Sequence, residues 1–312
     1  MISAPGKILW IGSYSVVFGG LGHVIAIDKR VRCEVHESNI PIYETSFGTF
    51  SQGGNELIES VITELNSAGH KVPPLRVRLM NDPEFIYHGR KTGLGSSSAA
   101  TVALTAAIYE HIYKSLDLNA IYKIAQRANW RRQKGIGSGF DIAAAVYGSV
   151  VYRKFSDVDK VDSYQEPLRI GSNVSMLVGV SGRPSSTVEL VRKFMEGKPR
   201  VEGILKDVMI ENELGINLLR RGKVDEAAAH ARLARELLAK AAKTVGVDLH
   251  GELGRVIEEA EEWGAYAAMS PGAGGGEIYF AIGDDLKKVE ELWKNEGLYV
   301  FPVKEDRGVS IE

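Results

Sequence analysis

The stretch KTGLGSSSAA, at residues 91–100, constrains the fold most strongly because it joins a glycine loop to the start of a helix. Gly93 and Gly95 allow the backbone to approach a ligand closely. The apolar residues that follow recur at intervals of three and four, which predicts a helix over residues 98–113. Serine hydroxyls and the first N–H groups of that helix would face the loop, an arrangement that binds anions and above all phosphates. Taken alone, the stretch also fits a helix N-cap with a flexible approach.

This loop differs from two common phosphate-binding loops. The spacing GxxxxGK[ST] of the Walker A loop is absent. A dinucleotide-binding fingerprint is excluded as well, since the sixth position of GxGxxG is a serine and the chain does not begin with the required strand–loop–helix unit. Other parts of the chain must therefore decide which ligand the loop holds.

The size and charge of the chain limit its partners. Its 312 residues suggest two domains, at about 150 residues per domain. The formal net charge of −2 argues against a nucleic-acid-binding protein, which usually carries a strongly basic surface. We therefore expect a small-molecule ligand, held by a local site, and no nucleic-acid partner.

The residue types in the chain argue against several other classes of protein. The single cysteine, Cys33, rules out a disulfide framework, and the seven histidines show no metal-binding spacing. There is no apolar run of about 18 residues, so we expect no membrane span. The first residues contain Pro5 and Gly6 and lack the charged segment of a signal peptide. A cytoplasmic location is expected.

Predicted strands and helices are clustered and do not alternate strictly, which favours an α+β fold over a doubly wound sheet. The chain turns polar over residues 156–172. We place there the boundary between a first domain, residues 1–165, and a second, residues 166–312. Leucine and alanine at helical spacing in residues 200–243 predict two long helices, whose apolar faces could pack in the core or form a homodimer interface.

Polar residues and glycines predict where several helices begin and end. Asn55 and Asn119 are expected to be N-caps. A further helix is expected over residues 185–197, with serine caps at its start and Gly197 at its end.

Two more glycine-rich stretches and one lysine suggest a ligand site. GIGSGFD, at residues 135–141, places Asp141 before a short helix, where it could also serve only to complement the helix dipole. PGAGGGE, at residues 271–277, has four glycines in five positions, and their entropic cost favours close approach to a ligand or another loop over a plain hairpin. Lys7, in SAPGKILWIG, begins the first strand. A lone lysine is usually a solvated charge, so its value depends on the other stretches.

Together and in this order, these stretches resemble the GHMP kinase superfamily. SAPGK resembles its first motif, KTGLGSSSAA its second and PGAGGGE its third, so the likeness covers nearly the whole chain. Within the superfamily, KTGLGSS, GSGFDIAAAVYG and SGRPSSTVELV are most similar to the phosphomevalonate kinases. Ser13 and Tyr14 stand where mevalonate kinases usually carry a Glu-His pair, and the tyrosine is similar to phosphomevalonate kinases.

The resemblance implies a two-domain GHMP kinase fold, with an N-terminal domain like the second domain of ribosomal protein S5 and a ferredoxin-like C-terminal domain. ATP, Mg²⁺ and the acceptor would meet in the cleft between them, with Lys7 and Asp141 as catalytic residues and Ser97 as a metal ligand. The residues expected to bind ATP are Lys91, Gly93, Leu94, Gly95, Ser96, Ser97, Ser98 and Ala99. Those expected to bind the substrate are Ser13, Tyr14, Ser138, Gly139, Arg183, Ser185, Ser186, Thr187, Gly274 and Gly275.

One position departs from the related mevalonate kinases, which carry a magnesium-binding glutamate eleven residues before the catalytic aspartate. In this chain the residue eleven positions before Asp141 is Trp130, which is not acidic. Metal ligation would then rest on Ser97, the phosphates and water, or on an acid that the sequence does not identify.

The implied activity is ATP-dependent phosphorylation of 5-phosphomevalonate to 5-diphosphomevalonate, a step of the mevalonate route to isoprenoids. A phosphomonoester has a second pKa near 6, so at neutral pH it is mostly a dianion and needs no general base. Asp141 would then fix Lys7 through an ion pair, whereas with an alcohol as acceptor it would be the base. Bringing two anions together requires cations. Candidates, each of which also fits a solvated helix end or loop, are Arg131, Arg132, Lys134 and Arg183.

Three alternatives remain open from the sequence. A mevalonate kinase or a diphosphomevalonate decarboxylase would use the same ATP loop on a related acceptor. A non-catalytic ATP-binding sensor would keep the fold, but such proteins usually lose the lysine, the aspartate or the loop glycines. Here Lys7, Asp141 and all the loop glycines are present.

Overall fold

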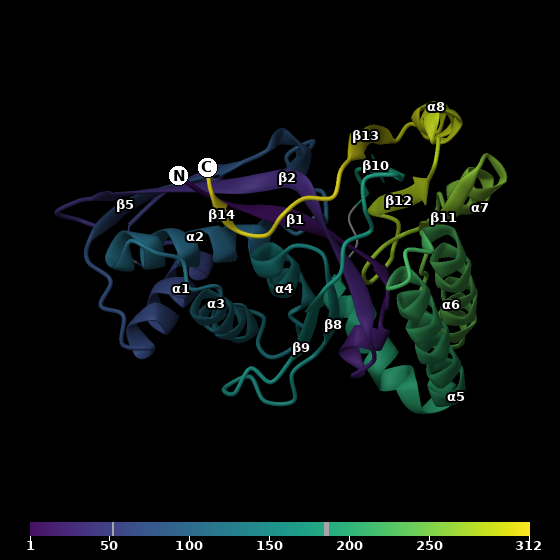
Figure 1. Cartoon of the computed structure of the whole chain (residues 1–312), viewed down its shortest axis with the longest axis horizontal. Helices are drawn as coiled ribbons and strands as arrows, with labels where there is room; N and C mark the ends of the chain where they lie inside the picture. The colour runs from purple at the N-terminus through teal and green to yellow at the C-terminus, as the bar shows by residue number, and fades with distance from the viewer. Residues whose placement is uncertain (52, 184–186) are drawn as a thin grey trace.

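Two large β-sheets organise the computed structural model, which describes residues 1–51, 53–183 and 187–312, without the side chains of residues 187 and 188 (Figure 1). The path of the first sheet is β14 (Ser310–Ile311), β1 (Ile2–Ile11), β2 (Gly22–Glu37), β5 (Leu75–Asn81), β3 (Ile42–Thr45) and β4 (Gly48–Phe50). Off this path, β8 (Val150–Arg153) pairs with β2, and β9 (Tyr164–Pro167) pairs with β8. All pairs are antiparallel except that of β3 with β5.

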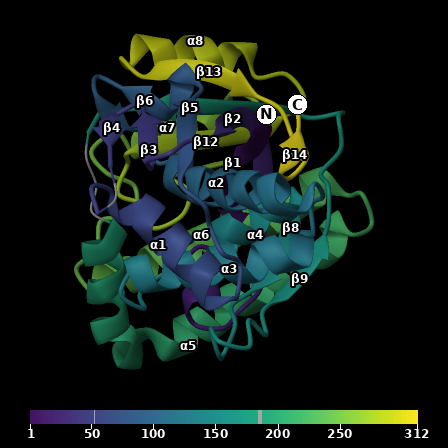
Figure 2. The ribbon, with the colours of Figure 1, turned by 90° about the vertical axis from the view of Figure 1, so that its left-hand side faces the viewer.

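Four helices lie on one face of the first sheet (Figures 1 and 2). They are α1 (Glu56–Ser67), α2 (Ser96–Tyr113), α3 (Leu118–Arg132) and α4 (Phe140–Tyr147). Helices α2 and α4 pack directly on β1 and β2, and α1 and α3 pack on α2. A short hairpin of β6 (Ile86–Tyr87) and β7 (Arg90–Lys91) leads into the loop before α2. The sheet and helix layers therefore place the start of α2 beside β1.

The second sheet is fully antiparallel, in the order β11 (Ala265–Met269), β12 (Ile278–Gly283), β10 (Ser175–Val180) and β13 (Tyr299–Val303). Side chains of α7 (Arg255–Glu262) and α8 (Lys287–Asn295) join its strands in one buried cluster. Helices α5 (Thr187–Leu219) and α6 (Val224–Thr244) form a long hairpin beside it (Figure 1). The two sheets with their helices confirm the expected α+β fold. In the described part of the chain, no helix is both long and apolar enough to cross a bilayer.

The predicted end of a helix at Gly197 is wrong. Helix α5 continues through Gly197 and Pro199. Proline removes a backbone donor and disfavours a helix interior, but Phe194, Val201 and Leu205 are buried in one cluster with side chains of α6. Packing against α6 therefore outweighs the local signal.

Helix caps agree only in part with the prediction. Asn55 caps α1 as predicted, with Oδ1 accepting hydrogen bonds from the N–H groups of Leu57 and Ile58. Helix α3, however, is capped by Asp117, because its carboxylate accepts from the N–H group of Asn119 at 3.0 Å. The helix therefore begins before the predicted cap.

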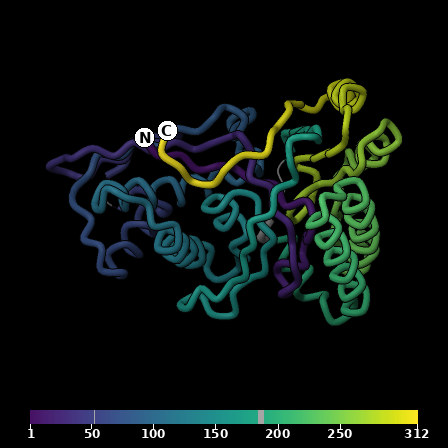
Figure 3. Tube along the Cα trace, viewed as in Figure 1, coloured from purple at the N-terminus to yellow at the C-terminus, as the bar shows by residue number. Residues whose placement is uncertain are grey.

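The path of the chain crosses the predicted domain boundary twice. Strand β9 spans residues 165 and 166, so by strand pairing the first sheet continues to Pro167. Strand β14, near the C-terminus, then returns to pair with β1. Figure 3 shows this last segment running back along the first sheet, so that the two termini lie side by side.

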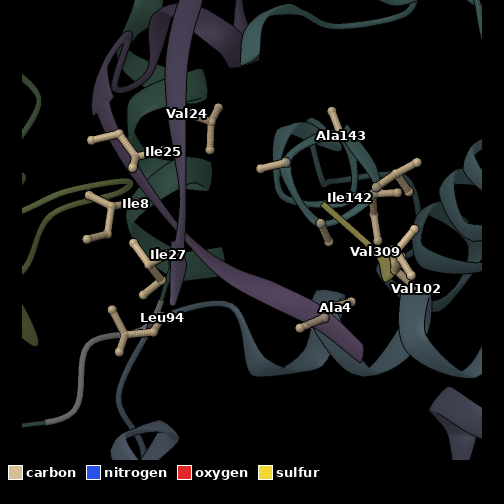
Figure 4. Close-up of a cluster of buried hydrophobic side chains, with 14 of the residues drawn as sticks. Ala4, Ile8, Val24, Ile25, Ile27, Leu94, Val102, Ile142, Ala143 and Val309 are labelled. Atoms are coloured by element: carbon tan, nitrogen blue, oxygen red, sulfur yellow. The ribbon is translucent and has the colours of Figure 1, made fainter. Parts of the chain in front are cut away.

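Both sheets contribute to one hydrophobic core. Figure 4 shows part of it, where Val24 lies on the side of the strands that faces α4, whereas Ile8 and Ile25 lie on the opposite side. Val178 and Phe280 of the second sheet are buried in the same cluster. Because this core is continuous, the two halves of the molecule are held in contact.

Arg30 fastens the returning segment to the first sheet. It is only 5% exposed, and its guanidinium donates to Asp306 Oδ2 at 2.7 Å and to the carbonyl of Gly308 at 2.8 Å. Its Nε also donates to Ser3 Oγ at 2.8 Å. The buried cation is therefore hydrogen-bonded on several sides by the chain's two ends.

Substitution of Arg30 by alanine is expected to lower the free energy of unfolding by about 3–5 kcal/mol, because it removes a buried, multiply hydrogen-bonded guanidinium and leaves the partly buried carboxylate of Asp306 and carbonyl groups without a donor. Urea denaturation measures this change. The control is Arg76→Ala, which removes an exposed pair with Glu44 and should cost at most about 1 kcal/mol. Equal effects of the two substitutions would show that Arg30 does not anchor the segment.

Candidate active site

A cavity of about 600 Å³ opens between the two halves of the molecule. Its walls come from β1, the loop before α2, the segment between α3 and α4, and the glycine-rich loop between β11 and β12. These are the four stretches that the sequence analysis singled out. A cavity of this size suits a small-molecule substrate.

Lys7 ties β1 to the loop before α2. Its backbone N–H donates to the carbonyl of Leu94 at 2.8 Å, and its Nζ donates to the carbonyl of Gly93 at 3.0 Å. Gly95 has φ +85°, and a Cβ at this position would lie 2.9 Å from Lys7 Cγ. Leu94 is buried in the core beneath the loop (Figure 4). The loop is therefore fixed around the lysine, and the glycine is required for this close approach.

The N-terminus of α2 faces the cavity without a side-chain cap. Gly95 is the N-cap residue, and the helix begins at Ser96, two residues before its predicted start. Ser96, Ser97 and Ser98 line the cavity. The first N–H groups of this helix and its positive dipole end are thus available to an anion.

Asp141 lies in the first turn of α4 and accepts a hydrogen bond from the hydroxyl of Ser98. The segment before it is held by buried side chains, because Tyr152 donates to the carbonyl of Ser138 at 2.6 Å and Gln126 donates to that of Gly139 at 2.7 Å. These bonds fix the position of the carboxylate.

The expected ion pair between Lys7 and Asp141 is not formed. The lysine ammonium is hydrogen-bonded to Gly93, and the carboxylate to Ser98. Exclusion of water lowers the pKa of Lys7, and the negative charges of Asp141 and Glu277 act in the opposite direction. The two carboxylates therefore act on the lysine through space.

Three cations gather on the wall of the cavity. Lys91, Arg132 and Lys134 line it, and none of them forms an ion pair within the described part of the chain. Desolvation, followed by the nearby charge of Arg132, lowers the pKa of Lys91. Their mutual repulsion would be relieved by an anion bound between them.

The other two predicted cations are engaged elsewhere. Arg131 forms an ion pair with Glu64 of α1. Arg183 is exposed and forms an ion pair with Glu252. Neither lines the cavity, so their charges serve surface contacts in this structure.

The glycine-rich loop of residues 271–277 is held from both halves of the molecule. The hydroxyl of Tyr14 donates to the carbonyl of Ala273 at 2.9 Å. On the other side, Ser181 Oγ donates to the carbonyl of Gly276 at 2.6 Å. The loop is therefore an ordered wall of the cavity.

The structure brings most of the predicted site residues together. Those that line the cavity are Lys7, Tyr14, Lys91, Gly93, Gly95, Ser96, Ser97, Ser98, Ser138, Asp141 and Gly274. Their individual roles remain predictions.

Other predicted residues lie behind the wall. Leu94 and Ala99 are buried in the core, because the helix must pack on the sheet. Gly139 is the N-cap of α4 and faces Gln126. Ser13 lines a separate cavity of about 30 Å³. The substrate-binding roles predicted for Ser13 and Gly139 therefore have no support from the geometry of the cavity.

The remaining predicted residues lie further from the centre. Gly275 donates its N–H to the carbonyl of Leu249, so it faces the supporting loop. Ser185 and Ser186 lie outside the described residues. Thr187 begins α5, and its side chain also lies outside them.

Glu277 is a residue that the sequence analysis missed. It follows the four glycines and lines the cavity beside Gly93. Desolvation raises the pKa of its carboxyl, and the charge of Lys7 partly offsets this rise. The only sequence signal was an acidic residue at the end of PGAGGGE, which a strand start could equally explain.

Comparisons with known proteins agree with this geometry. Family models match residues 56–149, as the GHMP kinases N terminal domain, and residues 218–295, as the GHMP kinases C terminal domain. A protein of Saccharolobus solfataricus named phosphomevalonate kinase is 51% identical over 100% of this chain and 98% of its own length. The chain belongs to the phosphomevalonate kinase family of the GHMP kinases.

More distant GHMP kinases share the fold along the whole chain. A solved structure of Streptococcus pneumoniae phosphomevalonate kinase, in complex with phosphomevalonate and AMPPNP, superposes with a TM-score of 0.82 at 20% identity, covering 98% of this chain and 100% of that one. A Pyrococcus furiosus protein named mevalonate kinase is 24% identical over 92% of this chain and 90% of its own length. Full-length identity thus favours the phosphomevalonate kinase family over the mevalonate kinases.

In this member of the phosphomevalonate kinase family, Tyr14 joins the two domains. It is only 2% exposed, its ring packs against Phe194 of α5 with 4.1 Å between centroids, and its φ of 59° is uncommon for a residue with a side chain. The hydroxyl bond to Ala273 then fixes the glycine-rich loop. Tyr14 thus forms part of the wall and also supports it.

Substitution of Tyr14 by phenylalanine is expected to lower the free energy of unfolding by about 1–3 kcal/mol, because the carbonyl of Ala273 loses its donor. Hydrogen exchange of residues 271–277 should become faster. Urea denaturation and mass spectrometry measure these two effects. Tyr164→Phe, which removes an exposed bond to Glu166, is the control and should change neither. Exchange that stays at the wild-type rate in Tyr14→Phe would contradict this role.

Proposed function

We propose that the protein transfers the terminal phosphoryl group of ATP to the phosphate of 5-phosphomevalonate, giving 5-diphosphomevalonate and ADP. One observation carries the proposal: an uncapped helix N-terminus, a lysine fixed beneath it and three cations that form no ion pair with any described residue converge on one cavity. The 51% identity to a relative named phosphomevalonate kinase supports the choice of acceptor. The choice of 5-phosphomevalonate is also supported by Tyr14, because a tyrosine at this position is similar to phosphomevalonate kinases, whereas mevalonate kinases carry a histidine.

The loop before α2 would hold the ATP phosphates. Its N–H groups, the helix dipole and Lys91 favour negative charge at this point. An adjoining cavity of about 240 Å³ shares Lys91, Ser96, Ser97 and Arg132 with the main one. Its other walls include the apolar side chains of Phe47, Leu57, Ile58 and Leu79. We assign the nucleoside to this cavity, because a planar base suits apolar walls beside the phosphate site.

Mg²⁺ would be bound chiefly through the nucleotide. Ser97 lines the cavity, and its hydroxyl, unlike that of Ser98, has no hydrogen-bond partner within the described part of the chain. A magnesium ion keeps several waters and binds substrate phosphates, so one hydroxyl ligand fits its chemistry. Trp130 packs edge-on against Phe155 and offers no ligand. Among the residues described, no group of three or more acidic, histidine or cysteine side chains forms a protein metal site. When bound, the ion neutralises charge on the transferring phosphoryl group.

The acceptor phosphate would be held by cations opposite the nucleotide. Arg132, the last residue of α3, and Lys134, in the segment that follows, line the cavity together with Lys7. Phosphoryl transfer needs positioning and charge neutralisation more than proton transfer. A dianionic phosphate is already a nucleophile, so Asp141 is not required as a base. It orients Ser98 and adds negative charge near Lys7 instead.

Release of ADP from MgATP tests the proposal, with mevalonate, 5-phosphomevalonate and 5-diphosphomevalonate offered separately. We expect turnover with 5-phosphomevalonate alone and no CO₂. Lys7→Met should lower kcat by about 10²-fold or more, because it removes the cation that is held at the carbonyl of Gly93. Turnover with mevalonate would identify a mevalonate kinase, and CO₂ release from the diphosphate would identify a decarboxylase. No turnover with any acceptor would favour the non-catalytic alternative.

A further inference from the structure

Glu277, from the second domain, lies against the loop of residues 92–95 before α2, which we call the phosphate loop. Its Oε2 lies 3.3 Å from the position that a Cβ on Gly93 would occupy, so the glycine leaves room for the carboxylate. Gly93 has φ +75° and is the residue whose carbonyl accepts from Lys7 Nζ. The carboxylate and the lysine ammonium therefore meet at one residue of the loop.

The carboxylate of Glu277 is half-buried and unpartnered. Within residues 1–51, 53–183 and 187–312 it forms no hydrogen bond and no ion pair. An acid in this position repels the phosphates of ATP unless a cation lies between them. Such a costly arrangement is typical of functional sites.

We propose that Glu277 is a positioning residue that keeps the ammonium group of Lys7 charged and directed at the reacting phosphates. This inference rests on the proposed kinase function. Lys7 packs at 5.5 Å over the ring of Phe140 and is largely shielded from water, so its charged form needs support from neighbouring groups. A neutral amine would not stabilise the transferring phosphoryl group.

The charges around Lys7 come from both domains. Asp141 of α4 and Glu277 before β12 favour its charged form, and they oppose the desolvation that lowers its pKa. The same cavity is also lined by Lys91, Arg132 and Lys134, and their positive charges favour the neutral form of Lys7. Asp141 already accepts a hydrogen bond from Ser98, whereas the carboxylate of Glu277 accepts none from the described residues. Removing the charge of Glu277 must therefore make Lys7 lose its proton at a lower pH.

The experiment measures the protonation of Lys7 directly. Acetic anhydride modifies neutral amines, and mass spectrometry of the peptide that contains Lys7 gives the rate of modification at each pH. The wild type is compared with Glu277→Gln, Glu277→Asp and the control Glu262→Gln, which makes the same change on the exposed surface of α7. Parallel profiles of kcat/KM against pH and against Mg²⁺ concentration are recorded.

In Glu277→Gln, the pH at which half of Lys7 is protonated should move to lower pH. The value of kcat/KM should then fall more at pH 9 than at pH 7, by up to about tenfold for each pH unit that this midpoint moves below pH 9. Glu277→Asp, which keeps the charge, should stay within about threefold of wild type at both pH values. Glu262→Gln should match wild type. Should Glu277→Gln not fold, Glu277→Ala, which also removes the charge, is measured instead and should show the same shift to lower pH.

Two results would overturn the proposal. The first is an unchanged midpoint for Lys7 in Glu277→Gln, with activity lowered equally at all pH values. The second is an unchanged midpoint together with a higher Mg²⁺ requirement, which would make Glu277 a metal ligand. The modification rates do not depend on any acceptor, so wild-type inactivity toward 5-phosphomevalonate would reject the proposed function and leave this comparison valid.

Discussion

The two hydrogen bonds from Lys7 to the phosphate loop are the interaction on which the site depends. The backbone bond to Leu94 places the loop against β1, and the Nζ bond to Gly93 places the ammonium group beneath it. Both hydrogen bonds require glycine at position 95, because a Cβ there would lie too close to the side chain of Lys7. Because Leu94 is buried in the core, the position of the loop is coupled to the packing of the first domain. The charged centre of the cavity is thus preorganised by the fold.

The second domain completes the site because the core is continuous between the sheets. Val178 and Phe280 share a cluster with β1 and β2, which holds the start of β12 near the phosphate loop. Tyr14 then joins the first domain to the glycine-rich loop at Ala273. The cavity is therefore formed only when both domains pack together, and its two carboxylates, Asp141 and Glu277, come from different domains.

The sequence predicted the parts of the site that need unusual residues. Glycine-rich loops, Lys7 and Asp141 stand out because few other roles require such residues in that order. By contrast, Glu277 was missed, since a single acid at the start of a strand has no local signal and gains its role from a contact with Gly93. Ser13 was included because of its position in the first motif of the resemblance, although it lines a different cavity.

The fold was predictable where local and tertiary preferences agree. Asn55 caps its helix as its side chain suggests, and the alanine-rich helix α2 is buried as its composition suggests. Pro199 is a local signal that packing against α6 overrides. The return of β14 to β1 depends on Arg30, which lies about 280 residues away in sequence and has no local pattern.

The most direct test of the account is a structure of the protein with a non-hydrolysable ATP analogue and 5-phosphomevalonate. The quantity to measure is the distance from Lys7 Nζ to the nearest oxygen of the γ-phosphate. We expect hydrogen-bond contact, about 3 Å, with the phosphates at the N-terminus of α2 and the acceptor phosphate facing Arg132 and Lys134. Phosphates bound away from this loop, with Lys7 still bonded only to Gly93, would contradict it.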